Sequence, residues 1–322
     1  MTARPFFSII IPIRQPNSLL RQTQRYLQRQ TLQDFELIVV SDKECGNVSP
    51  AVKRNFGANK AAGQYLVFLD DDSYPAHNYL QVAKKLVTLH PSYAAFCGPC
   101  LTPPANNWRQ QATGIILSSW LGSGGAGTYR NRPQKPRFVN DYPSVNLIVK
   151  ASVFHQVRGF DTHHWPGEDT LLCLAIIQQK LLIYYHPKLV VYHHRRQIIW
   201  PLVQQHMRYG QHRGFFAKRY PQNSFQLGYL IPSFLTIYLL LSPILFLLHP
   251  LTLLPLLAYL ALLSGFFVKL LFSHPLKFAL ATTLTIGLIH ISYGINFIIG
   301  YFSSALQFIP HQIDQQGNYL GG

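Results

Sequence analysis

The sequence predicts an α/β domain followed by a C-terminal membrane region of three helices. Three observations predict it: apolar runs alternate with helical segments over the first seventy residues, carboxylates follow the ends of those runs, and the last hundred residues are almost free of charge. Alternating strands and helices favour a parallel sheet with right-handed crossovers. The composition changes near Pro221, so we expect a cytosolic domain at 1–220 and a membrane region at 221–322.

The first strand is expected at Phe7–Ile13, a run that is apolar except for Ser8 and is typical of a strand covered on both faces. The pattern then predicts, in order, a helix through Leu19–Leu27, a strand at Phe35–Val40, a helix at about Ala51–Ala62 and a strand at Tyr65–Leu69. Further strands are expected at Tyr93–Phe96, Val145–Val149, Leu181–Tyr185 and Leu189–Tyr192, with a helix at Thr170–Lys180.

The glycines of Gly122–Gly127 follow no P-loop pattern, because no Lys-Ser/Thr pair comes after them. They predict a mobile loop that covers the substrate, with a passive linker as the alternative.

Three long apolar stretches predict membrane spans at about 229–248, 251–273 and 278–302. Each is long enough for a hydrocarbon core of roughly 30 Å, whereas buried helices of a soluble protein are the alternative. Lys269 and Lys277 lie in the second short loop, and cytoplasmic loops retain Lys and Arg. We therefore expect a multi-pass protein of the plasma (inner) membrane with its catalytic domain facing the cytoplasm and its C-terminus outside.

The chain carries 28 basic and 12 acidic residues, a formal net charge of +16. Such charge could indicate a nucleic-acid-binding protein. The basic residues are most frequent just before the first apolar stretch, however, where anionic lipid headgroups attract them. We expect membrane lipids and phosphate-rich substrates as partners, and no nucleic acid. The cysteines, including the lone C-x-x-C of Cys97 and Cys100, match neither a disulfide framework nor a zinc site.

Asp70, Asp71 and Asp72 follow the third predicted strand directly. Three adjacent carboxylates repel one another, and their useful property is to bind a hard divalent cation while leaving positions open for phosphate. An acidic surface turn is the alternative. Arg14 and Asp42 follow the first two strands, and ligands collect at the carboxyl ends of parallel strands. The sequence therefore predicts a ligand site at this edge.

A second pair of carboxylates, Glu168 and Asp169, precedes the helix expected at Thr170–Lys180. Acidic residues also suit a helix N-terminus, which is the structural alternative. Of the 11 acidic residues before position 221, six belong to the groups already named, Asp42, Asp70, Asp71, Asp72, Glu168 and Asp169. This concentration favours function, and Asp169 is a candidate general base.

The segments FFSIIIPIRQP, FELIVVSD, KRNFGANKAAGQYLVFLDDD and GFDTHHWPGEDTLL occur in this order. Together they resemble family 2 glycosyltransferases of the GT-A fold, over about residues 5–215. The chain is similar to members with C-terminal transmembrane helices that build exported or lipid-linked polysaccharide. The resemblance implies a Rossmann-like mixed sheet that binds a nucleotide-sugar.

The resemblance also implies roles for single residues. Asp169 matches the catalytic base, and Asp72, assisted by Asp70, matches the ligand of a divalent metal, Mg or Mn. The residues that match donor-binding positions are Pro12, Arg14, Asp42, Arg54, Asn55, Gly57, Asp70 and Asp71. Among them, Asp42 matches the nucleobase contact, and the R-N-x-G segment borders the donor pocket.

Weaker contacts with the acceptor or the diphosphate are expected from Glu168, His193, His194, Gln204 and Arg208. The two histidines could equally face lipid headgroups. Gln204 and Arg208 fall where similar enzymes have a Q-x-x-R-W motif, although Gln205 is the glutamine with that spacing to Arg208. Tyr209 replaces Trp, which disfavours processive chain extrusion. Residues 197–220 suit an interfacial amphipathic segment, with packing against the sheet as the alternative.

The expected function is inverting, metal-dependent transfer of a sugar from a nucleotide-sugar to a hydroxyl of a membrane-associated, polyprenyl-linked glycan, a hexosyltransferase-like activity. One alternative is a polyprenyl-phosphate glycosyltransferase, whose acceptor phosphate is already ionised and would not need the same base. Another is a non-catalytic membrane scaffold of a polysaccharide-assembly complex.

Overall fold

The computed structural model describes residues 4–164 and 166–304, which form two compact units. The sheet unit contains the described residues of 4–103 and 129–194, and the helical unit contains 104–128 and 195–304. The division differs from the compositional boundary near Pro221, because residues 104–128 and 195–220 pack with the C-terminal helices. Residues 1–3 and 305–322, with the predicted location of the C-terminus, lie outside the described residues.

The sheet unit is built on a mixed sheet of seven strands in the order β2-β1-β3-β8-β5-β9-β7. The strands are β1 (Phe7–Pro12), β2 (Phe35–Val40), β3 (Tyr65–Phe68), β5 (Ala95–Cys97), β7 (Arg137–Val139), β8 (Leu147–Lys150) and β9 (Ile183–Tyr185). The first three are parallel, as predicted, whereas β8 runs antiparallel to both of its neighbours. The predicted α/β class with a mixed sheet is confirmed.

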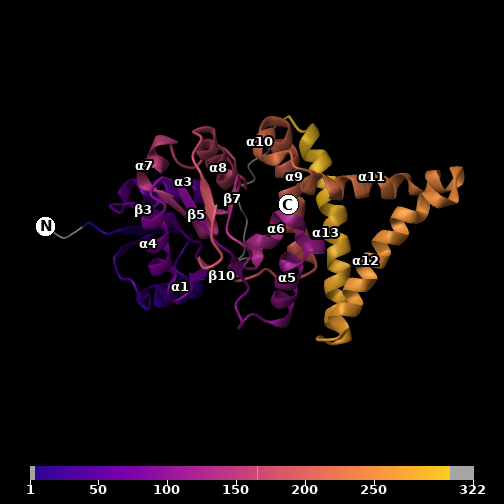
Figure 1. Ribbon diagram of the computed structural model, residues 1–322, viewed down its shortest axis with the longest axis horizontal. Coiled ribbons are helices and arrows are strands. Elements are labelled where there is room, and N and C mark those ends of the chain that lie inside the picture. The colour runs from indigo at the N-terminus through magenta and orange to yellow at the C-terminus, as the bar shows by residue number, and fades with distance from the viewer. Residues whose placement is uncertain (1–3, 165, 305–322) are drawn as a thin grey trace. The chain divides into compact units, whose positions relative to one another are not determined.

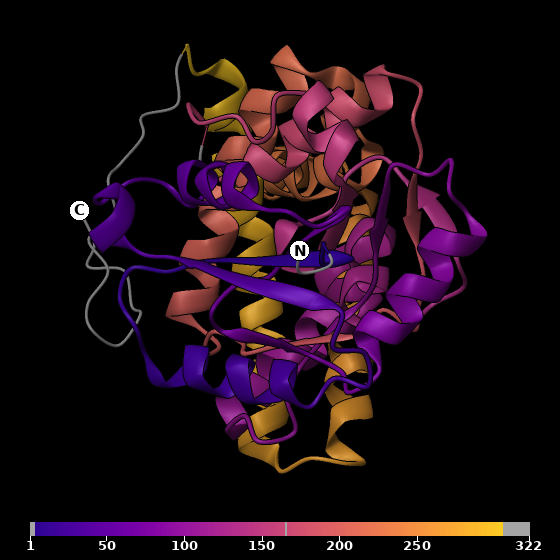
Figure 2. The ribbon, with the colours of Figure 1, turned by 90° about the vertical axis from the view of Figure 1, so that its left-hand side faces the viewer.

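Helices cover both faces of this sheet, as Figure 2 shows for the indigo strands between α1 below and α3 above. One face carries α1 (Ser18–Gln28) and α4 (Tyr79–Leu89); the other carries the short helix α7 (Ala151–Gln156) with α3 (Pro50–Lys60) and α8 (Glu168–Gln178). Side chains alternate along a strand, so Ile9 and Ile11 pack toward the first layer and Ile10 toward the second. Burial on both faces explains why β1 is apolar except for Ser8.

A second, three-stranded sheet has the order β4-β10-β6, with β4 (Ser73–Pro75), β6 (Cys100–Leu101) and β10 (Val191–His193). In it β10 pairs antiparallel with β4, so that His193 lies opposite Ser73. This small sheet therefore brings the end of β10 to the acidic turn that follows β3.

The helical unit contains the helices α5 (Trp108–Ser118), α9 (Trp200–Arg219), α10 (Pro221–Ser224), α11 (Leu227–Leu248), α12 (Leu254–Leu271) and α13 (Leu276–Phe302). A 3-10 turn, η2 (Pro250–Leu253), precedes α12. Figure 1 shows α11 extending away from α13 and α12 returning toward the opposite end of α13. By length and composition, α11, η2 with α12, and α13 could each cross a membrane.

The glycine-rich segment is helical and not a loop, so that prediction was wrong. Gly122–Gly127 lies in α6 (Trp120–Asn131), which consists of two helical pieces that meet at Gly124, where φ is 58° and ψ is −171°. Glycine is a poor helix former, which is why the composition suggested a loop. Packing explains one of the glycines, because a Cβ added at Gly122 would lie 2.2 Å from the carbonyl oxygen of Ile116.

Several boundaries also differ from the predictions by about two residues; the strands expected from Tyr93, Leu181 and Leu189, for example, begin at Ala95, Ile183 and Val191. The helix expected from Thr170 begins at Glu168, which places Glu168 and Asp169 in its first turn. The strand expected from Val145 begins at Leu147, after a 3-10 turn at Ser144–Asn146.

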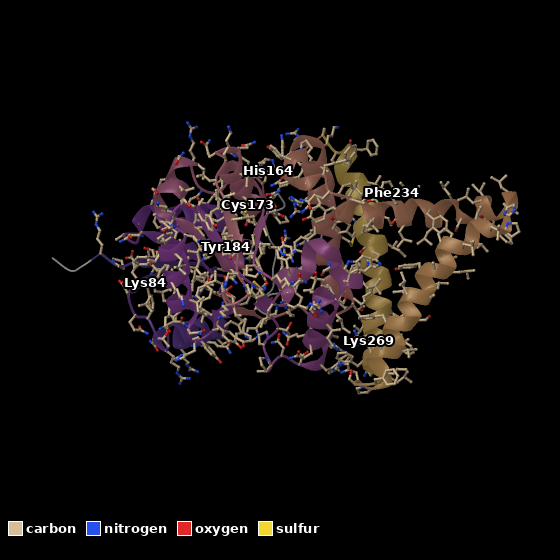
Figure 3. The ribbon with its side chains drawn as sticks, viewed as in Figure 1. Lys84, His164, Cys173, Tyr184, Phe234 and Lys269 are labelled. Atoms are coloured by element: carbon tan, nitrogen blue, oxygen red, sulfur yellow. The ribbon has the colours of Figure 1, made fainter. Side chains whose placement is uncertain are left out.

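All four cysteines are free thiols. Cys97, Cys100 and Cys173 are buried, and Cys173 lies inside the sheet unit (Figure 3). Burial raises the pKa of the Cys97 and Cys173 thiols well above the usual value. These thiols behave as small apolar core groups.

Candidate functional site

The carboxyl ends of β1 and β2 are joined by backbone hydrogen bonds. The amide of Ile13 donates to the carbonyl of Val40 at 2.8 Å, and the amide of Asp42 donates to the carbonyl of Arg14 at 3.0 Å. Pro12 ends β1 and is buried. Parallel pairing therefore places Arg14 and Asp42 at one edge of the sheet, as predicted from the strand order.

The buried side chain of Lys53 contacts the residues that follow β1 and β2. Its ammonium group donates to the carbonyl of Ile13 at 2.7 Å and to the carboxylate of Asp42. The Lys53 side chain is 4% exposed and that of Asp42 is 31% exposed. A buried ammonium group needs an opposite charge, so Lys53 holds Asp42 in one orientation while the carboxylate stays open to solvent. Sequence reasoning missed Lys53, although its place directly before Arg54 was a usable signal.

Asp70, Asp72 and His193 form a group that could hold a metal ion: one ligand atom from each lies within 4.8 Å of the others. His193 Nε2 is 3.2 Å from Asp72 Oδ1. Two carboxylates and an imidazole suit Mn²⁺, and the carboxylates also suit Mg²⁺. All three side chains are partly exposed, which leaves room for water and phosphate oxygens. The chemistry of the donor set therefore fits the predicted metal.

His193 and His194 have different surroundings. His193 faces Asp72, whereas the His194 ring is 2.8 Å from Gln22 Oε1 on α1. The His194 amide donates to the backbone carbonyl of Asp72 at 2.9 Å. Burial lowers the pKa of His194, against the opposing effect of the Asp72 charge. His193 is therefore the histidine of the metal-competent group, and His194 fixes the backbone beside it.

Arg54 joins the two acidic motifs. Its buried guanidinium donates to Asp70 Oδ1 at 2.6 Å and to Glu168 Oε1 at 2.9 Å. The ring of Phe160 lies 5.5 Å from its Cζ. The pKa of Glu168 rises to about 7 because the carboxyl is buried and lies beside the charge of Asp169, with Arg54 opposing the shift. One side chain on α3 thus links the turn after β3 to the first turn of α8.

Removing Arg54 is expected to destabilise the sheet unit strongly. Arg54→Met would leave the Glu168 carboxyl buried without its counter-charge, a loss of about 3–5 kcal/mol in the free energy of unfolding. Chemical denaturation of the full chain in detergent would measure it. Lys60→Met, on the exposed end of the same helix, is the matched control and should change stability by less than about 1 kcal/mol. Equal stability of the two variants would contradict a structural bridge.

Asp169 lies in the first turn of α8 next to Glu168. Its Oδ2 accepts a 3.4 Å hydrogen bond from the amide of Ser144, and its Oδ1 accepts one of 2.8 Å from the amide of Thr170. These backbone donors hold the carboxylate in one orientation. This is the arrangement that a general base requires.

Asp71 is not a member of the metal-competent group found among the described residues. Its Oδ2 accepts a 2.5 Å hydrogen bond from Asn17, the N-cap of α1. Burial, followed by the charge of Asp72, raises the pKa of Asp71 to about 6. The structure thus gives Asp71 a place at the start of α1, and its predicted contact with the donor stays a prediction.

Asn55 and Gly57 position two segments that border the site. The Asn55 side chain donates to the carbonyl of Phe160 at 2.8 Å and accepts from its amide at 2.9 Å. A Cβ added at Gly57 would lie 2.7 Å from the Ile10 side chain, so glycine lets α3 approach β1. The two residues hold the segment before α8 and the helix that carries Arg54.

Gln204 and Arg208 lie one turn apart on α9, in the helical unit. Their predicted contacts with acceptor or diphosphate remain predictions from the resemblance.

Comparisons with known proteins agree on one group of enzymes. The family model described as "Glycosyl transferase family group 2" matches residues 65–302. The pre-mycofactocin glycosyltransferase of Mycobacterium tuberculosis is 25% identical over 176 residues, which cover 54% of this chain and 36% of that protein. An uncharacterised glycosyltransferase of Haemophilus influenzae is 30% identical over 122 residues, covering 29% of this chain and 48% of that protein. The chain therefore spans less than half the length of these relatives.

Among solved structures, the mannosyltransferase PcManGT of Pyrobaculum calidifontis, in complex with GDP-Man and Mn²⁺, is similar over 93% of this chain and 88% of that chain. The TM-score is 0.52 and the sequence identity is 16%, so the likeness concerns the fold.

Proposed function

Because the chain belongs to glycosyl transferase family group 2 and has a GT-A fold, we propose that it transfers a sugar from a nucleotide-sugar to a hydroxyl of a membrane-associated, polyprenyl-linked glycan. The proposed transfer inverts the anomeric carbon and depends on a divalent metal. One observation carries the proposal: Arg54 ties Asp70, of a metal-competent group, to Glu168, the neighbour of a candidate base.

The donor subsite is assigned to the carboxyl ends of β1 and β2. Asp42 presents a partly exposed carboxylate, oriented by Lys53, which would accept a hydrogen bond from a ring N–H of the nucleobase. Arg14, beside it on the adjoining turn, would supply positive charge for the phosphates. Pro12, Asn55 and Gly57 would shape this subsite through the backbone.

The metal subsite is assigned to Asp70, Asp72 and His193. A bound Mg²⁺ or Mn²⁺ would supply positive charge to the donor diphosphate and its leaving oxygen. Arg54 would keep the Asp70 carboxylate in place through their hydrogen bond.

The base is assigned to Asp169. In the proposed single displacement, the acceptor hydroxyl oxygen bonds to the anomeric carbon as the bond from that carbon to the diphosphate oxygen breaks. The nucleoside diphosphate leaves with the bonding electrons, and Asp169 takes the hydroxyl proton. Hydrogen bonds from the amides of Ser144 and Thr170 hold the carboxylate during this transfer. No covalent intermediate with the protein is required.

A lipid-linked acceptor fits the membrane helices of the chain, because α11, η2 with α12, and α13 are each long and apolar enough to cross a bilayer. We assign the protein to the plasma (inner) membrane with the sheet unit facing the cytoplasm, since the basic residues gather before α11. Glu168, His194, Gln204 and Arg208 remain proposed secondary contacts around the acceptor or diphosphate.

The test is a donor screen with the purified full chain in lipid nanodiscs. UDP- and GDP-sugars would be added with Mn²⁺ or EDTA, with and without a bacterial lipid extract as acceptor, and release of nucleoside diphosphate would be measured. We expect release that needs metal, one donor and the lipid extract, with a glycosidic product. A phosphodiester product would instead establish a polyprenyl-phosphate glycosyltransferase. Thermal stabilisation of the protein by each donor would be measured in parallel. If no donor stabilises the protein and none releases nucleoside diphosphate, the result would favour the non-catalytic scaffold.

A further inference from the structure

The C-terminal half of α13 packs closely against α9. A Cβ added at Gly210 would lie 2.4 Å from the carbonyl oxygen of Tyr293, and one added at Gly214 would lie 1.9 Å from that of Phe297. From the other side, a Cβ added at Gly300 would lie 1.9 Å from the carbonyl oxygen of Gln211. Glycines on both helices thus let the two backbones touch over several turns.

The N-terminal half of α13 packs against α5. The rings of Trp108 and Phe278 have centroids 6.3 Å apart, and the Lys277 ammonium lies 5.6 Å from the Trp108 ring. Farther along, Ile286 and other buried side chains of α13 share a cluster with α5 and α9; its members include Ala112, Ile116, Leu202, Phe278 and Ile289. The helix therefore has partners along most of its length.

These partners are too polar for the hydrocarbon core. α9 carries four cationic side chains, those of Arg208, Arg213, Lys218 and Arg219. Charged side chains are rare and costly inside a bilayer. In addition, 44% of the most apolar stretch of α13 is buried in the protein, against 17% in α11 and 0% in η2 with α12. Because α13 packs against α5 and α9, it must lie where these polar helices can lie, outside the hydrocarbon core.

The end of α13 that α11 contacts is also incompatible with three membrane crossings. In a chain that crosses three times, the first and third helices run in the same direction, so their starts share one side of the membrane. Here the start of α11 meets the C-terminal third of α13: a Cβ added at Gly294 would lie 2.3 Å from the carbonyl oxygen of Pro232. Figure 1 shows α11 beginning there and leading away from α13.

Both ends of α13 are tied to segments outside the spans. At its C-terminal end, Arg219 of α9, which lies shortly before α11, donates to the carbonyl of Ser304 at 3.0 Å. At its N-terminal end, Lys277 lies over Trp108 of α5. The two ends of α13 thus lie beside helices that precede the first crossing.

Apart from Lys277 at its start, the exposed side chains of α13 form one apolar stripe, with a residue every three or four positions: Leu276, Leu280, Leu284, Leu288, Ile291, Ile295, Ile299 and Phe302. The neighbouring helices expose three tryptophans, Trp108, Trp120 and Trp200, by 40%, 67% and 59%. An apolar stripe with nearby tryptophans is typical of a helix lying at the membrane interface.

We propose that α13 lies in the plane of the membrane interface and that the chain crosses the bilayer twice, through α11 and α12. The stripe faces the acyl chains, and α5 and α9 cover the opposite side with their charged groups in the headgroup layer. Ser304 then lies on the same side of the membrane as the sheet unit, contrary to the predicted outer C-terminus. The charge pattern agrees, since Lys269, near the turn into α13 (Figure 3), and Lys277 stay inside. The turn at His249 has no Lys or Arg.

Cysteine labelling of the full chain in intact cells tests this topology. In a Cys45→Ser background, whose other three cysteines are buried, one cysteine at a time is introduced at an exposed position, Lys43, His249 or Ser304, and the protein is treated with a membrane-impermeant maleimide. We expect labelling of His249→Cys in intact cells, whereas Lys43→Cys and Ser304→Cys react only after permeabilisation. Labelling of Ser304→Cys in intact cells, or protection of His249→Cys there, would overturn the proposal.

A depth measurement provides an independent check if Ser304→Cys folds poorly or reacts slowly. Nitroxide labels at Leu280, Leu288 and Ile295 are compared in nanodiscs by their collision rates with oxygen and with a nickel chelate. An in-plane α13 places the three labels at one shallow depth. A deep label at Leu288 between two shallow ones would show that α13 crosses the membrane. Neither measurement depends on catalytic activity, so the topology can fail while the proposed function stands.

Discussion

Asp169→Asn is expected to lower turnover by about 10²–10⁴ and to leave donor binding nearly unchanged. The amide keeps the size of the carboxylate but cannot take the acceptor proton. Because Asp169 accepts its hydrogen bonds from the amides of Ser144 and Thr170, the asparagine oxygen can retain one of them. Single-turnover transfer with the donor found in the screen measures the chemical step, and calorimetry measures the donor dissociation constant.

Asp34→Asn is the matched control for this variant. Asp34 precedes β2, at the edge of the sheet opposite to the site, and its carboxylate accepts from Lys84 at 2.8 Å. Its removal should leave turnover within about twofold, because an exposed ion pair contributes little. Near-normal turnover in Asp169→Asn would eliminate the base assignment. Loss of donor binding would instead assign Asp169 to the donor subsite.

Asp72→Asn is expected to abolish metal-dependent donor binding. Outer-sphere partners of a metal typically contribute 10–100-fold to its affinity, so loss of a direct ligand should cost at least about 100-fold. The remaining Asp70 and His193 could not by themselves hold the ion against water. Titration with Mn²⁺, followed by its electron paramagnetic resonance signal, gives the metal affinity without any need for turnover. Thermal stabilisation by UDP or GDP with Mn²⁺ gives the donor response.

The adjacent histidines supply the control for the metal site. His193→Ala removes a member of the group with Asp70 and Asp72, whereas His194→Ala removes a ring that faces Gln22. We expect a loss of Mn²⁺ affinity of at least about 100-fold in the first variant, as for a direct ligand, and little change in the second. Equal losses of Mn²⁺ affinity in the two variants would show that both histidines act only through the fold of β10. Unchanged Mn²⁺ affinity in both variants would exclude His193 from the metal site.

Local patterns predicted the first half of the sheet well. β2 begins and ends where its apolar run does, and β1 and β3 differ from their predicted ends by one residue. A buried parallel strand consists of a few consecutive apolar residues, so the local sequence is enough to predict its bounds. The location of Asp42 and Asp70 at one edge then followed, because parallel strands end together.

The partners of these residues could not be predicted in the same way. Arg54 meets Glu168 across 114 positions of the chain, and His193 reaches Asp72 only because β10 pairs with β4. Neither contact has a periodic signal. The glycine-rich segment failed for a related reason: its composition suggested flexibility, while the requirement at Gly122 comes from Ile116, in a different helix.

The sequence by itself determined the α/β class, the carboxylates at the strand ends and the presence of three long apolar helices. Each of these depends on the local order of apolar, polar and charged side chains, which local chain geometry turns into strands, turns and helices. Only the tertiary structure decided that Arg54 links two motifs, that His193 completes an acidic group, and that α13 packs against α5 and α9 along most of its length. Hydropathy counts how apolar a helix is, but the polarity of the helices packed against it decides where it can lie.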